Sequence, residues 1–151
     1  MKGFYDITTA LQTHFNNDVL VNTVTEGDIF EVDLNKQTIF PLVHVMVNNA
    51  TFEVNVVRFN ISLIAMDIVD ISKKATTDVF RGNSNEQDVL NTQLEVLNRA
   101  YALMLHGNLW DSKVVVDGNP LCEPFTERFE NYLAGWTMTF DVLIPNEVTI
   151  C

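Results

Sequence analysis

The side chains that could support acid–base catalysis or metal binding are few in this sequence, and their spacing matches no known motif. The three histidines, His14, His44 and His106, have no Glu or Asp at the spacing of an HExxH zinc motif. Asp67 and Asp70 could serve a metal or acid–base site, but such residues more often end a strand and begin a loop. We therefore interpret these residues as structural and expect no catalytic residue, metal or cofactor.

Motifs for nucleotide binding and nucleophilic catalysis are missing as well. The six glycines are scattered singly, without GxGxxG or GxxxxGK[ST], and there is no GxSxG elbow. Cys122 and Cys151 form no CxxC pair, and no histidine is placed to complete a zinc site with them. We expect both to be reduced thiols in a cytosolic protein, and we expect the protein not to be an enzyme.

Charge and hydropathy exclude further classes of partner. The formal net charge is -11 and the sequence pI is about 4.4. Affinity for phosphate groups needs a basic surface, so direct binding to nucleic acid or to an anionic membrane is not expected. The longest apolar run is far shorter than a membrane span. The chain has 151 residues, of which 47% are hydrophobic, which predicts a single domain over 1–151 with a real core.

Hydrophobic spacing predicts two helices. The first covers residues 3–17, where the apolar side chains fall three and four apart on one face. They are Phe4, Ile7, Leu11 and Phe15. The second covers residues 85–106, with a capping box from Ser84 to Gln87 and Gly107 as its C-cap. Its predicted apolar stripe is Leu90, Leu94, Leu97, Tyr101 and Leu105.

The other apolar segments predict strands rich in β-branched residues or alternating in polarity. They are residues 19–24, 38–48, 51–68, 112–116, 122–129 and 133–144, while 29–34 is either a short strand or an extended loop. Pro41 cannot donate a ladder hydrogen bond, so it should lie near a strand start or on an edge. We expect turns at 48–51 and 117–120, and a β-bulge at Val56–Val57, where the apolar parity switches.

The order helix, strands, long helix, strands predicts an α+β fold. Tight turns between successive strands favour a mostly antiparallel, twisted sheet rather than a chain of βαβ units. The two helices would pack on one face of this sheet. Residues 72–84 interrupt the pattern with a long, irregular, polar loop.

Two features favour contacts with another protein chain. The loop 72–84 carries Lys73, Lys74, Phe80 and Arg81 on an otherwise acidic protein, so it could meet the acidic face of a second copy. The alternative is a mobile surface loop. The strand 51–68 is too long for a domain of this size to cover fully, so its end could project and pair with a neighbour. The alternative is a bent strand within a twisted sheet.

The order of these segments resembles a family of phage proteins. The similarity is carried by Phe40–Val45 and Val57–Asp67 in the predicted hairpin, by the helix with Leu90 to Tyr101, and by the closing Leu133–Asn146. Over residues 38–146 the chain resembles the tail-terminator and tail-completion (neck or ring) proteins of tailed bacteriophages. Its ending LAGWTMTFDVLIPN is similar to that of ring proteins in crAss-like phages.

The resemblance implies a tail-terminator-like fold and a structural virion protein. Copies of the chain would form a homo-oligomeric ring at the head–tail junction or in the tail. The ring would join connector and tail, contact other neck and tail proteins, and let DNA pass without specific binding. The protein would be made in the host bacterial cytoplasm and end in the virion.

Two other functions are compatible with the sequence. One is a small-molecule-binding or enzymatic α+β domain, with Asp67, Asp70 and His44 as its site. The other is an assembly scaffold or chaperone, which would be absent from mature particles.

Overall fold

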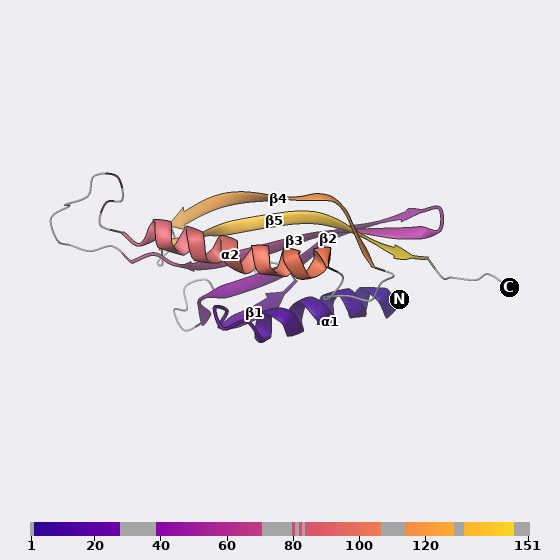
Figure 1. The fold of residues 1–151 in the computed structure, drawn as a ribbon, viewed down its shortest axis with the longest axis horizontal. Helices are drawn as coiled ribbons and strands as arrows, with labels where there is room; N and C mark the ends of the chain where they lie inside the picture. Colours follow the sequence, from indigo (N-terminus) through magenta and orange to yellow (C-terminus); the bar gives the residue numbers. More distant parts are fainter. Residues whose placement is uncertain are drawn as a thin grey trace.

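Five strands form one sheet, and both helices lie on the same face of it (Figure 1). The computed structural model describes residues 2–27, 39–70, 80, 82, 84–106, 114–128 and 132–146. The elements are α1 (Lys2–Asn16), β1 (Thr23–Glu26), β2 (Leu42–Glu53), β3 (Val56–Ile68), α2 (Glu86–Leu105), β4 (Val115–Arg128) and β5 (Tyr132–Pro145).

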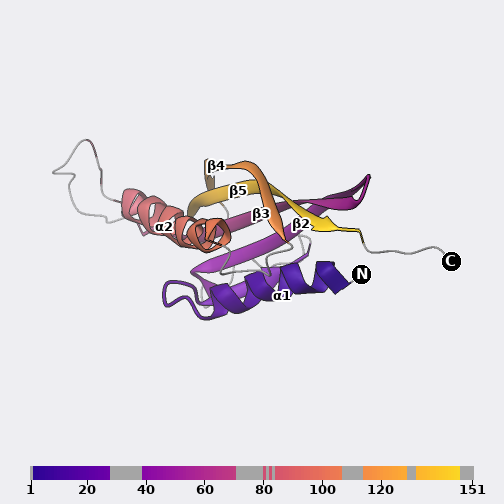
Figure 2. The same ribbon diagram turned by 45° about the vertical axis from the view of Figure 1, so that its right-hand side comes forward.

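The strand order across the sheet is β1-β2-β3-β5-β4. β1 pairs with β2 in parallel, whereas the pairs β2–β3, β3–β5 and β4–β5 are antiparallel. This arrangement confirms the predicted α+β fold with a mostly antiparallel sheet and two helices on one face. The turned view in Figure 2 shows α1 and α2 side by side in one layer against the sheet.

The main core lies between the helices and the sheet. The predicted apolar face of α1 is confirmed, because Ile7, Leu11 and Phe15 are fully buried and Phe4 packs beside them. Alternate residues of β3, from Val57 to Ala65, point to the same core, as the period of two in a strand requires. Burial of each large apolar side chain stabilises the fold by about 1.5–3 kcal/mol.

The predicted apolar stripe of α2 is wrong in part. Of its five residues only Leu97 is fully buried, while Leu94 is 37% and Leu105 is 65% exposed. The buried residues of α2 are Val89, Gln93, Val96, Leu97, Ala100 and Met104. Most of these residues stand one position before a residue of the predicted stripe, so the buried face is rotated by about one residue around the helix axis.

The predicted capping box of α2 is also wrong. The N-cap is Asn85, and it makes no side-chain hydrogen bond to the helix. Its Oδ1 instead accepts the backbone N–H of Asp70 at 2.7 Å, and its own N–H donates to the Asp70 carbonyl oxygen at 3.2 Å. The Asn85 side chain therefore joins the end of β3 to the start of α2. The proposed C-cap Gly107 lies outside the described residues.

The hairpin between β2 and β3 turns later than predicted. Residues 48–51 continue β2, and the turn is Val54–Asn55, with Asn55 at φ 67°. The bulge lies in β2 between Val47 and Asn49, not at Val56–Val57, where β3 simply begins. The Asn48 side chain donates to Asn60 and Ser62 of β3, so it is used inside the sheet rather than in a turn.

The other strand boundaries need three corrections. β1 begins only at Thr23, since residues 19–22 form turns and a bend after α1. Residues 117–120 are a register shift within one long β4 rather than a turn between two strands. Residues 29–34 lie outside the described part of the chain. Pro41 directly precedes β2, which confirms its prediction at a strand start.

We predict that Gly135→Ala strongly destabilises the fold. A Cβ at Gly135 in β5 would overlap the backbone carbonyl oxygen of Ala65 in β3, which has no free space to move. We expect the free energy of unfolding, measured by urea denaturation, to fall by about 3 kcal/mol. Gly118→Ala is the control. A Cβ at this position meets open space, but the backbone has φ +74°, so the substitution should lower the free energy of unfolding by about 1 kcal/mol. Equal effects of the two substitutions would contradict this prediction.

Candidate interaction surface

The sheet face opposite the helices carries a row of hydrogen-bonded polar side chains across three strands. Asn48 of β2 donates to the Asn60 side chain at 2.8 Å and to the Ser62 hydroxyl at 2.7 Å. Asn60 donates in turn to Asp141 of β5 at 2.9 Å, and the Ser62 hydroxyl lies 3.2 Å from that of Thr139. Ser62 is buried, so these bonds also satisfy a group that water does not reach. The row fixes the register of β2, β3 and β5.

Arg58 continues this row toward the hairpin and the outer strand. Its guanidinium donates to Glu53 at 3.2 Å, to Asp141 at 3.3 Å and to Asp117. Hydrogen bonds to Asp117 and Glu53 raise the pKa of Arg58 above its usual value. One cation therefore joins the end of β2, the start of β4 and the middle of β5. These side chains are solvent-accessible, so salt will weaken the attraction.

The β2–β3 hairpin extends past the helices (Figure 1). Its tip carries Phe52, which is 75% exposed, and Val54, which is 88% exposed. Phe52 lies opposite Val57, a core residue on the helix side, so Phe52 points to the same side but beyond the helices. The tip is thus an apolar surface on a hairpin that β5 supports by backbone pairing as far as Val56.

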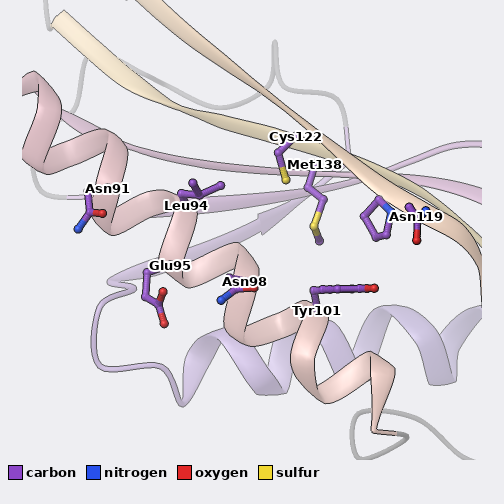
Figure 3. A pocket seen from close by; sticks show the side chains of 9 residues that line it. Asn91, Leu94, Glu95, Asn98, Tyr101, Asn119, Cys122 and Met138 are labelled. Atoms are coloured by element: carbon purple, nitrogen blue, oxygen red, sulfur yellow. The ribbon is translucent and has the colours of Figure 1, made fainter.

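A groove of about 380 Å³ opens between α2 and β4 on the helix side of the sheet (Figure 3). It forms because α2 packs mainly on β3 and β5, leaving space beside the register shift of β4. Leu94, Cys122 and Met138 supply an apolar floor. The remaining lining residues are Asn91, Glu95, Asn98, Tyr101, Asn119 and Pro120. Burial raises the pKa of the Cys122 thiol, so less of it is thiolate than of an exposed cysteine.

Of the four interface residues expected from the sequence, the structure describes only Phe80. Lys73, Lys74 and Arg81 lie outside the described residues, so their role stays a prediction. Phe80 is described and is 85% exposed. The sequence did not indicate the groove, because its lining comes from three separate elements that only the fold brings together. A projecting strand end, by contrast, was one of the two alternatives that the length of the predicted strand 51–68 left open.

The three residues considered for a small-molecule site are not brought together. His44 lies opposite Ile64 on the helix-free face, where its Nε2–H donates to the Gly27 carbonyl at 2.8 Å and its Nδ1 lies 2.6 Å from the Thr25 hydroxyl. Asp67 lies opposite Ala134, which packs against α2 on the other face.

The remaining candidates have structural surroundings. Burial raises the pKa of the Asp67 carboxyl, and the exposed Asp70 is held through its backbone by Asn85. Burial lowers the pKa of His14, and His106 is the C-cap of α2. In the ranges that the structure describes, no group of three His, Cys, Asp or Glu residues could hold a metal ion.

Comparison with known proteins adds no relative. No protein-family model matches the chain, and no curated protein matches it. Among the described residues, no helix is both long and apolar enough to cross a membrane.

We predict that Asp67→Asn removes a pH-dependent loss of stability. The folded protein keeps the Asp67 proton at pH values where the unfolded chain has released it, because burial raises the folded-state pKa. The free energy of unfolding of the wild type should fall as the pH rises from the ordinary pKa of aspartate to the raised pKa of Asp67 in the folded protein. Above the raised pKa it should stay at the lower level. The asparagine variant should lack this fall and be more stable at pH 7.

The measurement is urea denaturation of wild type and variant from pH 3 to pH 7, with the exposed Glu123→Gln as the control. The two curves should converge at the acid end, where the wild-type carboxyl is also neutral. A variant that is equally destabilised at all pH values would contradict the assignment of burial as the cause.

Proposed function

We propose that this chain is a structural subunit that assembles with copies of itself into a ring at the head–tail junction or in the tail of a tailed phage. The ring would join connector and tail and let DNA pass. The observation that carries the proposal is that one sheet presents two different open strand edges, one of them on a projecting hairpin with an apolar tip.

The first open edge is β4, which is the last strand in the sheet and has no strand on its outer side in the part of the chain that the structure describes. The second is the distal half of β2, because β1 pairs only with Leu42–Val45 and leaves Met46–Glu53 without a strand neighbour on its outer side among the described residues. Open edges carry backbone donors and acceptors that another strand can pair with. The chain therefore has a place for a neighbour at both sides of its sheet.

The two edges differ in sequence and in surroundings, so the contact between them would join unlike surfaces. Such heterologous contacts generate closed rings when the rotation between subunits closes, and filaments when it does not. This supports the ring that the resemblance implies. The net charge of -11 supports the second part of the proposal, because an acidic wall would repel the phosphate backbone and let DNA slide.

A small-molecule-binding function is the second candidate. The groove between α2 and β4 has the volume of a ligand site and combines an apolar floor with three asparagine side chains. They are Asn91, Asn98 and Asn119.

A scaffold or chaperone role would also use self-association. Mass spectrometry of purified virions would distinguish a scaffold from a virion subunit, since only the virion subunit stays in the particle.

The experiment that tests the proposal is light scattering of the purified full chain, combined with negative-stain images. We expect ring-shaped particles whose mass is a multiple of 17.1 kDa and exceeds the mass of a dimer. A monomer at all concentrations would contradict the proposal. A monomer that binds a metabolite in the groove would favour the second candidate.

We also predict that replacing residues 74–82 with a short Gly-Ser linker leaves the monomer fold intact but abolishes assembly. The fold should survive because the Asp70–Asn85 backbone contacts hold β3 and α2 together at the ends of this segment. Circular dichroism checks the fold, and light scattering checks the mass. Retained assembly would remove the loop from the interface but would leave the two strand edges as the contact.

A further inference from the structure

We propose that the hairpin tip of one copy docks along β4 of the next copy and inserts Phe52 into the groove between β4 and α2. This inference rests on the proposed self-assembly and specifies the contact that makes it. The occupant is a second copy of this chain, because the chain offers both the apolar tip and the apolar groove.

The tip cannot reach the groove of its own molecule. Phe52 lies opposite Val57, and Val57 lies opposite Ile144 of β5. The groove lies at Met138, six residues from Ile144 along the same strand, which corresponds to about 20 Å. The tip thus lies at one end of the sheet and the groove at the middle of β4 and β5, so a contact between them has to join two molecules.

The faces of the sheet match in such a contact. Phe52 and Val57 point to the helix side of β2 and β3, and Cys122 and Met138 point to the helix side of β4 and β5. If β2 of one copy continues the sheet of the next copy beyond β4, Phe52 stays on the helix side. The groove opens on this same side, because α2 forms one of its walls (Figure 3).

The chemistry of the groove fits an aromatic side chain and the strand that carries it. Leu94 and Cys122 would contact the ring, and the Met138 sulfur would add the favourable contact that thioethers make with aromatic edges. At the rim, the side chains of Asn98 and Asn119 can donate to and accept from a neighbouring backbone. The groove therefore provides both a pocket for the anchor and partners for its main chain.

Two prolines make the pairing selective. Pro120 and Pro124 in β4 have no N–H, so a strand added there makes fewer ladder hydrogen bonds than a strand on an ordinary edge. Backbone pairing alone is then weak, which discourages random strands. A strand that also carries an aromatic residue at the position of the groove would bind, and the hairpin tip is such a strand.

Disulfide trapping tests the contact, because Cys122 lines the groove. In a Cys151→Ser background, Phe52→Cys should form intermolecular disulfides with Cys122 under mild oxidation at high protein concentration, which offsets the loss of the aromatic ring. Since each copy carries one tip and one groove, a non-reducing gel should show a ladder beyond the dimer. Adding Cys122→Ser should remove the ladder. Val19→Cys is the matched control, because Val19 is 92% exposed but lies after α1, away from both edges.

A second variant measures the strength of the contact. Phe52→Asp should raise the protein concentration needed for half-maximal assembly at least about tenfold, as expected for loss of a central aromatic anchor. Its fold should be unchanged by circular dichroism, because Phe52 is largely exposed. If wild type assembles while Phe52→Asp assembles equally well and no ladder forms, the contact is wrong and the proposed function stands. If wild type is a monomer at all concentrations, both fail together.

Discussion

The structure depends on one constraint: backbone donors and acceptors at the edge of a sheet need partners, and the described residues supply them for only part of this sheet. β1 is short and pairs with only the first residues of β2, and no other described strand pairs with the outer side of β4. The helices cover the middle of the sheet but not the hairpin tip (Figure 1). The proposed assembly follows from these uncovered parts.

Strand pairing and the polar row together hold the hairpin beyond the helices. Isolated two-stranded hairpins are marginally stable in water. Here β5 adds a third strand, because it pairs with β3 as far as Val56 and its end bonds to Asn55 in the turn. The side chains of Asn60 and Asp141 add a bond between β3 and β5, and Arg58 connects the hairpin to β4. The hairpin can therefore present an apolar tip that the helices do not cover.

The sequence predicted the elements whose periodicity is unambiguous. The α1 face from Ile7 to Phe15 and the alternation along β5 were expected from spacing alone, because every residue of these faces meets the same core. The resulting fold class was therefore predictable as well.

The errors arise where a tertiary contact replaces a local preference. Asn48 resembles a turn residue but bonds across the sheet, and Asn85 resembles a cap but bonds to the end of β3. The face of α2 was misplaced because its buried side includes the polar Gln93 and the small Ala100, which a search for large apolar residues passes over. The groove was not predictable, since Leu94, Pro120 and Met138 are neighbours only in the fold.

Hydrogen–deuterium exchange at low and high protein concentration tests most directly whether copies of the chain cover these edges. The account predicts that the outward-facing backbone amides of residues 46–53 in β2 and 115–128 in β4, which do not bond to β3 or β5, exchange fast in the dilute protein and become protected together as the concentration rises. Fast exchange in both segments of a fully assembled particle would contradict it, because the subunits would then be held together elsewhere.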